Sequence, residues 1–197
     1  MSLPKRDEIL HTYADYFGWP EDVRYELIDG VAYLMSPGPD LAHQDVVGEI
    51  YYQLRQALEG KPCRAYIAPL DVRLPKAGER DDLVDTVVQP DVMVVCQTER
   101  LDRRGVRGAP DFVVEVLSPS TAGHDHIRKR RIYERAGVRE YWLLHPVDRI
   151  LTIYCLGADG YGKPVVQELA GTTDVGVLPG ITITWDALIA RLPPLEY

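Results

Sequence analysis

The sequence has no long apolar run, and this sets the first limit on the class of protein. No stretch of its 197 residues approaches the roughly 18 consecutive apolar residues that a membrane-spanning helix needs. The opening residues, MSLPKRDEIL, lack the apolar segment of a secretory signal peptide. We therefore expect a cytoplasmic protein that makes no contact with a membrane.

Cysteine is also scarce. Cys63, Cys96 and Cys155 lie far apart in the sequence, at spacings that fit no metal motif and predict no disulfide framework. Two of them lie in strand-like runs, which favours buried packing residues. A reducing cytoplasm is consistent with this usage.

An excess of positive charge is missing as well. The chain has 22 Lys and Arg against 30 Asp and Glu, a formal net charge of −8. This argues against a protein that binds nucleic acid over its whole surface, because phosphate contacts require Lys and Arg. The charge is uneven, however: residues 79–91 are acidic, whereas arginines gather in residues 100–107 and 128–139. A local basic surface on an acidic protein fits this pattern.

Repeats, low-complexity segments and linkers are absent too, and the length suits one domain spanning residues 1–197. Hydrophobic periodicity and turn residues predict one α/β or α+β domain. The expected elements, in chain order, are a helix at 6–17, a hairpin at 24–35 through Asp29-Gly30, a helix at 40–59, strands at 64–74, 87–96 and 112–117 with a mobile loop at 75–86 before the second, a turn at 118–121, a helix at 125–136, a hairpin at 141–156, strands at 164–169 and 180–184, and a helix at 185–191.

Acidic residues interrupt two of the predicted core strands. Asp91 stands among valines, and Asp111 and Glu115 bracket an apolar run, on the same strand face at spacing i, i+4. Carboxylates on neighbouring strands are suited to a hard cation such as Mg²⁺ or Mn²⁺. The backbone carbonyl of Val116 is a further candidate ligand. A cation held there would activate water against a phosphodiester.

The predicted helix at 125–136 adds a lysine. At 100° per residue Asp125 and Lys129 fall on the apolar face, while Arg128, Arg131 and Arg135 fall outside. Because a buried ammonium needs a partner, we expect Lys129 to return toward Glu115 and to support the attacking water. The alternative is a simple ion pair between Asp125 and Lys129.

Several segments together resemble one family. Pro90-Asp91 followed by Glu115 resembles the PD-(D/E)XK nuclease motif, and the run from 109 to 142 is similar to the Uma-two family of bacterial restriction endonucleases. The residues that carry the resemblance are Tyr25-Glu26-Leu27-Ile28-Asp29-Gly30, His43, Gln89-Pro90-Asp91, Pro110-Asp111, Glu115-Val116-Leu117-Ser118-Pro119-Ser120-Thr121, Asp125, Lys129, Tyr133, Ala136-Gly137-Val138 and Glu140-Tyr141-Trp142.

The resemblance covers about residues 20–185 and implies a restriction-endonuclease-like fold, a central mixed sheet flanked by helices. It implies a divalent-metal site at Asp91 and Glu115, with Glu26 as an extra acid, and a site role for His43. One position departs from the motif: its lysine falls two residues after Glu115, where this chain has Leu117. We favour Lys129 as the replacement, and a weakened or inactive site is the alternative.

Other interpretations of these residues remain open. His43 fits a core histidine, Glu26 a solvent-facing hairpin acid, and Asp111 a turn or capping residue. The arginines at positions 100, 103, 104 and 107 fit either a solvated loop or phosphate contacts to DNA; the candidates are Arg100, Arg103, Arg104 and Arg107.

The working hypothesis is a metal-dependent endonuclease that hydrolyses DNA, in which Asp91 and Glu115 bind Mg²⁺ or Mn²⁺ and Lys129, Glu26 and Asp111 assist. Because both strands of a duplex must be cut, we expect a homodimer. One rival is a catalytically inactive module that binds nucleic acid or a partner, and another is a metallohydrolase for small phosphoesters.

Overall fold

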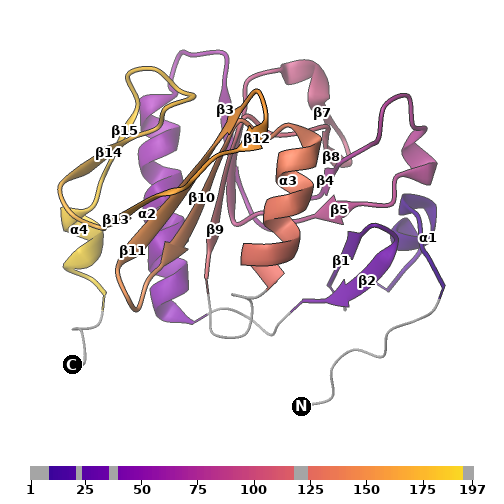
Figure 1. The fold of residues 1–197 in the computed structure, drawn as a ribbon, viewed down its shortest axis with the longest axis horizontal. Helices are drawn as coiled ribbons and strands as arrows, with labels where there is room; N and C mark the ends of the chain where they lie inside the picture. Colours follow the sequence, from indigo (N-terminus) through magenta and orange to yellow (C-terminus); the bar gives the residue numbers. More distant parts are fainter. Residues whose placement is uncertain (1–8, 21–23, 36–39, 118–123, 193–197) are drawn as a thin grey trace.

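Two β-sheets and the helices packed on them make up the fold (Figure 1). The structure is a computed structural model, and it describes residues 9–20, 24–35, 40–117 and 124–192. The predicted turn at 118–121 and the start of the helix predicted at 6–17 lie outside these residues. No described helix is both long enough and apolar enough to cross a membrane.

The larger sheet is mixed, as predicted. Its order is β12-β11-β10-β9-β6-β3, and β13 also pairs with β11. β9 and β10 run parallel, whereas the other pairs are antiparallel. The strands are β3 (Arg64–Ile67), β6 (Val92–Val95), β9 (Phe112–Val116), β10 (Glu140–His145), β11 (Ile150–Gly157), β12 (Gly160–Tyr161) and β13 (Val165–Glu168).

Side chains of β9 alternate between two apolar clusters. Phe112, Val114 and Val116 pack with α2 (Leu41–Ala57), whereas Val113 and Leu117 pack with the residues of α3 (Arg130–Ala136). This alternation follows from the period of two in a strand. The two helices therefore cover opposite faces of the larger sheet, and β9 is buried on both.

Helix α2 matches the helix predicted at 40–59. The Asp40 carboxylate accepts the His43 N–H at 2.8 Å and caps the helix, and Gly60 follows it at φ +72°. Its apolar positions give the buried face, formed by Val46, Val47, Ile50 and Leu54.

The smaller sheet contains the predicted N-terminal hairpin. Asp29 and Gly30 both have positive φ, 48° and 80°, as a two-residue hairpin turn of type I′ requires. The sheet order is β2-β1-β5-β4-β8-β7. Its strands are β1 (Tyr25–Ile28), β2 (Val31–Leu34), β4 (Val72–Arg73), β5 (Val87–Val88), β7 (Leu101–Asp102) and β8 (Gly105–Arg107), with α1 (Tyr13–Phe17), η1 (Asp81–Leu83) and η2 (Thr98–Arg100) beside them.

Two strands predicted as continuous are each divided between the sheets. Residues 64–74 form β3 and β4, separated by a cis Ala68-Pro69 bond, and residues 87–96 form β5 and β6, separated at Gln89-Pro90-Asp91. Proline has no N–H for a sheet ladder, which accounts for a break at Pro90. The chain therefore crosses between the sheets at Asp91.

The helix predicted at 125–136 is also modified. Its first part, His124–Lys129, is a π-helical turn (η3), and α3 continues from Arg130 to Ala136. Gly137 ends it in the left-handed conformation, as predicted, at φ 89°. A π turn is wider than an α turn and recurs at functional sites.

The C-terminal part packs on α2. β14 (Thr172–Asp174) pairs with β15 (Thr182–Thr184), and α4 (Asp186–Ile189) follows. The Gln53 side chain of α2 accepts the Thr184 N–H and donates to its carbonyl, both at 2.8 Å.

The prediction that the cysteines form no disulfide is wrong. Cys63 and Cys96 are joined by a disulfide. The antiparallel register of β3 and β6 pairs Arg64 with Val95, so the residues just beyond this pair lie opposite each other. Separation along the sequence contains no information about this register. Cys155 is free and exposed, so none of the three is a fully buried packing cysteine.

Candidate functional site

Glu115 lies near the C-terminal end of β9, the buried strand between β6 and β10. Its side chain faces α3 and is 3% exposed. Its Oε1 atom lies 3.0 Å from the Lys129 Nζ and accepts the Tyr133 hydroxyl at 2.7 Å. An acid in an apolar strand is thus paired with a cation and a hydroxyl from the next helix.

Lys129 bridges two buried carboxylates. Its Nζ lies 2.9 Å from Glu26 Oε1 and 3.0 Å from Glu115 Oε1, and its side chain is 6% exposed. Its position at the end of η3, just before α3, directs it inward, as the helical phase predicts. The side chain of Asp125 is outside the described part of the chain, so the predicted Asp125–Lys129 pair stays a prediction.

Glu26 comes from the second position of β1 and is buried, not solvent-facing. Its Oε1 atom also accepts the backbone N–H of Gln89 at 3.0 Å. The hairpin of the smaller sheet therefore contributes an acid to a cluster whose other members lie on β9 and beside α3. Among the described residues, this buried cluster holds two carboxylates around one ammonium.

Tyr133 donates its hydroxyl to the same cluster. Burial raises its pKa well above the usual value, and the charges of Glu115 and Glu26 add to the effect. The hydroxyl therefore stays protonated and keeps donating to Glu115. Sequence reasoning placed Tyr133 on the inward face without a role, although its i, i+4 spacing from Lys129 was a usable signal.

Asp91 lies opposite Glu115 on the neighbouring strand. β6 pairs Val92 with Val114, so Asp91 and Glu115 are the next positions along this antiparallel register. The Asp91 Oδ2 atom accepts the Val116 N–H at 2.8 Å and lies 3.3 Å from His43 Nε2. The Asp91 carboxylate thus takes the place of a backbone acceptor and extends the hydrogen-bond ladder between β6 and β9 by one position before β6 begins.

The two acids are approached from opposite faces of the sheet. His43 reaches Asp91 from the first turn of α2, whereas Lys129 reaches Glu115 from the α3 side. The Asp91 side chain is 20% exposed, compared with 3% for Glu115. Solvent therefore reaches the pair from the Asp91 side. Val116 contributes its N–H, and the metal role expected for its carbonyl stays a prediction.

Gln89, which carried part of the family resemblance without a predicted role, is a member of this region. Its side chain accepts from Arg24 Nε at 3.2 Å and donates to Asp71 Oδ1 at 2.8 Å. Its backbone N–H holds Glu26. Its place directly before Pro90-Asp91 was the only available signal.

Asp111 is not brought together with these residues. It precedes β9 and lies four residues, about 13 Å of extended strand, from Glu115. Its carboxylate accepts the Cys96 N–H at 2.7 Å and the Arg139 guanidinium at 2.7 Å. These contacts favour the turn or capping role over catalysis.

Three of the four arginines in the segment 100–107 contact other parts of the protein. Arg100 donates to the Ala109 carbonyl, and Arg107 Nε lies 3.1 Å from Asp81 Oδ1. Arg104 lies 3.6 Å from Asp81 and over the Phe17 ring, 4.7 Å from its centroid. Arg103 is exposed. The segment forms η2, β7 and β8 of the smaller sheet.

The donor set can be tested against the metal that the sequence predicts. Within the described residues, no group of three or more His, Cys, Asp and Glu side chains could hold a metal ion. Mg²⁺, however, is commonly bound through only one or two carboxylates, with waters and substrate phosphates completing its shell. Asp91 and Glu115 are oxygen donors of this type. Their chemistry fits Mg²⁺ or Mn²⁺, and the binding of one ion by both acids stays a prediction.

Comparisons with known proteins bear on the family and the fold of the chain. A crystal structure from Anabaena variabilis, described as a putative nuclease belonging to DUF820, superposes with a TM-score of 0.71 at 18% identity, over 91% of this chain and 97% of that chain. No curated protein matches the chain. The model of the Uma2 (Uma-two) family, described as "Putative restriction endonuclease", matches residues 13–186, which include Asp91, Glu115 and Lys129. The chain belongs to the Uma2 family.

Proposed function

We propose that this protein is a metal-dependent endonuclease that hydrolyses phosphodiester bonds in DNA. The observation that carries the proposal is Lys129, a lysine with a 6% exposed side chain held between Glu26 and Glu115, beside the opposed pair Asp91–Glu115. Buried, paired charges of this kind gather at functional sites. The family description supports a nuclease.

Asp91 and Glu115 would hold Mg²⁺ or Mn²⁺, with the Val116 carbonyl as an additional ligand. When bound, the ion supplies charge neutralisation at a phosphate oxygen and a more acidic water. His43 would orient the Asp91 carboxylate from α2, since its Nε2 lies 3.3 Å from Oδ2.

Lys129 would perform the function of the lysine in the PD-(D/E)XK motif. Leu117 lies on the same face of β9 as Glu115, but it is buried in the apolar cluster beneath α3 and has no charge to offer. The Lys129 ammonium reaches Glu115 from the helix instead. Its N–H groups would orient the attacking water, and its charge would stabilise the negative charge that develops at phosphorus. Glu26 would fix the position of Lys129, and Tyr133 that of Glu115.

Cleavage of supercoiled plasmid with Mg²⁺ or Mn²⁺ tests the proposal. We expect nicking by the wild-type chain and at least a 100-fold loss in Glu115→Gln, as for removal of a group that acts in the transition state. Nicking that persists in both Glu115→Gln and Asp91→Asn would remove these acids from the mechanism. DNA binding without cleavage by the wild type at any divalent ion would favour the inactive binding module.

We also propose a homodimer as the cleaving species, since each site would cut one strand. Sedimentation at the concentrations used for cleavage tests this, and a monomer that linearises plasmid in one encounter would contradict it.

A further inference from the structure

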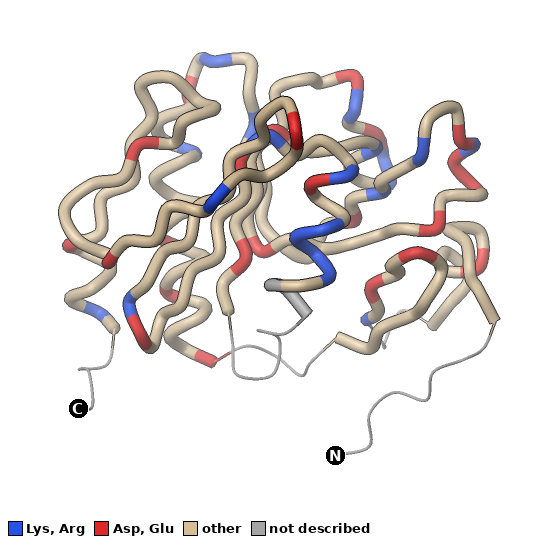
Figure 2. Tube along the Cα trace, in the orientation of Figure 1, with Lys and Arg blue, Asp and Glu red and all other residues tan. Residues whose placement is uncertain are grey.

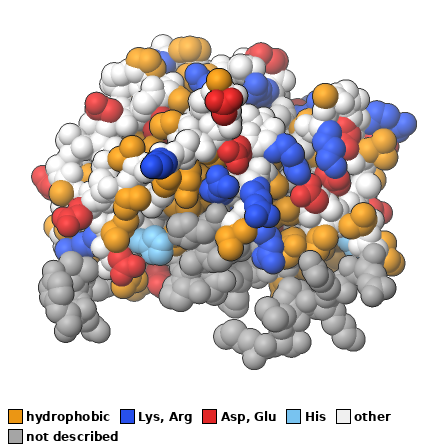
Figure 3. Space-filling model, viewed as in Figure 1, with side chains coloured by type: hydrophobic (Ala, Val, Ile, Leu, Met, Phe, Trp, Pro, Cys, Tyr) orange, Lys and Arg blue, Asp and Glu red, His pale blue; other side chains and the backbone are white. Residues whose placement is uncertain are grey.

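The helix that carries Lys129 has a strongly basic outer face. Residues 127–139 contain five Arg and one Lys against a single Glu, in a chain with a net charge of −8. Lys129 is turned inward, whereas Arg128, Arg131 and Arg135 are exposed. Figure 2 shows Lys and Arg along this helix, and in Figure 3 basic side chains gather over the same part of the surface.

The three exposed arginines form one row. Arg131 and Arg135 are four residues apart, on one side of α3, and Arg128 precedes them in the π-helical turn η3. The row begins next to Lys129, whose Nζ lies 3.0 Å from Glu115. It therefore runs from the candidate site outward along the surface.

The hairpin β1–β2 holds two members of this row in place. The Arg128 guanidinium lies over the Tyr33 ring, 4.9 Å from its centroid, which orients the cation. Arg135 lies 2.6 Å from Asp29, and both side chains are about half exposed, at 53% and 51%. Such an exposed ion pair contributes little, so a phosphate can replace Asp29 at low cost.

The arginines of the segment 100–107 are in a different electrostatic setting. The Asp81 carboxylate is shared by Arg73 at 2.6 Å, Arg107 at 3.1 Å and Arg104 at 3.6 Å. Their positive charge is therefore offset by acids of the protein itself. The α3 row has the larger excess of positive charge per residue.

We propose that Arg128, Arg131 and Arg135 form the surface that binds the phosphate backbone of duplex DNA, and that it, not the segment 100–107, directs the duplex to the candidate site. This inference rests on DNA as the substrate of the proposed function. Arginine is suited to the role because its planar guanidinium makes paired hydrogen bonds to phosphate oxygens.

Binding of the full chain to a fluorescent 30-base-pair duplex, in EDTA so that no cleavage occurs, tests the surface. The variant Arg128→Gln/Arg131→Gln/Arg135→Gln should bind at least 10-fold more weakly at 50 mM salt. The slope of log K against log salt should also become less negative by about 2 to 3, close to 0.9 for each lost phosphate contact.

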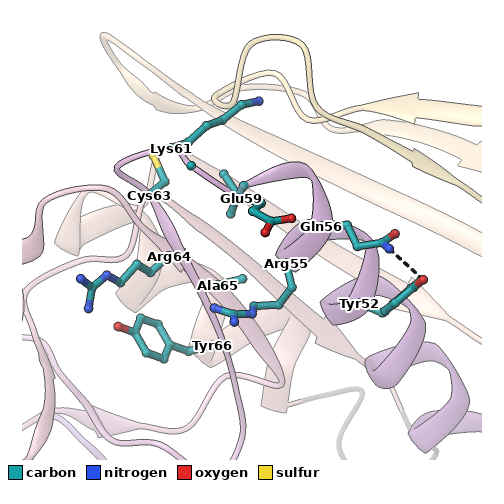
Figure 4. Close-up of a pocket in the computed structure, with 11 residues that line it drawn as sticks. Tyr52, Arg55, Gln56, Glu59, Lys61, Cys63, Arg64, Ala65 and Tyr66 are labelled. Atoms are coloured by element: carbon teal, nitrogen blue, oxygen red, sulfur yellow. Dashed lines mark hydrogen bonds between the residues drawn. The ribbon is translucent and has the colours of Figure 1, made fainter.

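A matched control removes three positive charges elsewhere. Arg55, Lys61 and Arg64 are exposed around a pocket at the C-terminal end of α2, the helix on the opposite face of the larger sheet (Figure 4). The variant Arg55→Gln/Lys61→Gln/Arg64→Gln should bind within about 3-fold of wild type, since only the net charge has changed. Thermal unfolding of both variants confirms that each is folded.

The outcomes separate this inference from the proposed function. Three outcomes would overturn the proposed DNA-binding surface. They are equal losses of affinity in the two triple variants, unchanged binding in the α3 variant, and no binding by wild type at 50 mM salt. Selective loss in the α3 variant would support the surface even if wild type never cleaves DNA, an outcome that overturns only the proposed hydrolysis. If Arg103→Gln/Arg104→Gln loses more affinity for the duplex than the α3 variant, the DNA-binding surface is the segment 100–107 and the proposal is wrong.

Discussion

The Asp91 carboxylate accepts the backbone N–H of Val116 at 2.8 Å, which ties the acid before β6 to the residue directly after Glu115. The position of Asp91 beside Glu115 is therefore set by the register of two strands and by a backbone hydrogen bond. One side chain thus combines the metal ligand that we propose with a structural acceptor, and substitutions can separate the two roles.

Asp91→Asn should keep the fold and lose the charge, because the Asn side-chain oxygen can still accept the Val116 N–H. We expect its free energy of unfolding to stay within about 1 kcal/mol of wild type, while Mn²⁺ binding and plasmid nicking are lost. Asp91→Ala leaves that N–H without its acceptor and should be destabilised by about 1–3 kcal/mol. Urea unfolding and Mn²⁺ titration measure the two effects; equal destabilisation in both variants would contradict the hydrogen-bonding role.

Lys129→Met should be strongly destabilising. It leaves the buried Glu26 and Glu115 carboxylates without the ammonium between them, which costs about 3–5 kcal/mol. Arg131→Met, on the exposed face of the same helix, is the control and should change the free energy of unfolding by no more than about 0.5 kcal/mol. A loss below about 1 kcal/mol in Lys129→Met would mean that the ammonium does not compensate the two acids.

Tyr133→Phe and Tyr161→Phe form a matched pair. Tyr133 donates to the Glu115 carboxylate at 2.7 Å, whereas Tyr161 donates to the neutral Val138 carbonyl at 2.8 Å. Hydrogen bonds to charged groups contribute more, so we expect losses of about 1.5–3 kcal/mol for Tyr133→Phe and about 0.5–1.5 kcal/mol for Tyr161→Phe. Only the first variant should also lower cleavage. The reverse order of stabilities would contradict a charged Glu115.

Alkaline pH should destabilise the protein through its buried tyrosines. Burial raises the pKa of Tyr16, Tyr133 and Tyr161, with Asp71, Glu115 and Glu134 respectively adding to the effect. Unfolded tyrosine ionises near pH 10, so the folded chain holds more protons above that pH and stability falls as pH rises. Each tyrosine contributes a slope of up to about 1.4 kcal/mol per pH unit.

Urea midpoints between pH 8 and 11 check this dependence. Below about pH 9 these tyrosines are protonated in both states and should add no slope. The free energy of unfolding of Tyr161→Phe should fall less steeply above pH 10 than that of wild type. An unchanged slope would show that Tyr161 does not contribute to the pH dependence.

The Cys63–Cys96 disulfide predicts a specific pattern of alkylation. Protein purified without reductant should take up one iodoacetamide adduct, at exposed Cys155, and three after unfolding in dithiothreitol. Loss of the cross-link, which spans 33 residues, should lower the free energy of unfolding by about 3–4 kcal/mol. Intact mass measures the first effect and urea unfolding with and without reductant the second. Three adducts before reduction would show that the bond is absent in solution.

Local patterns were enough to predict much of the fold. The Asp29-Gly30 turn, the helix from about residue 40, the helix end before Gly137 and the inward phase of Lys129 each depend on neighbouring residues, and the structure has all four. Lys129, Ile132 and Tyr133 are all buried. The helical periodicity of the sequence therefore identifies the inward face even though the helix begins with a π turn. The assignment of acids to core strands likewise needed only the apolar residues around them.

What the sequence could not supply was long-range pairing. The register of β3 and β6 placed Cys63 opposite Cys96, and that of β6 and β9 placed Asp91 opposite Glu115. The crossing of the chain between two sheets brought Glu26 of the hairpin to Lys129.

The sequence by itself therefore determined that Glu115 is a buried acid and which face of the helix is basic, because both follow from periods of two and 3.6 residues. Only the tertiary structure decided that Glu26, Glu115, Lys129 and Tyr133 form one cluster and that Asp111 lies apart from it. The physical reason is that contacts between distant segments depend on strand register and sheet order, which short-range periodicity does not encode.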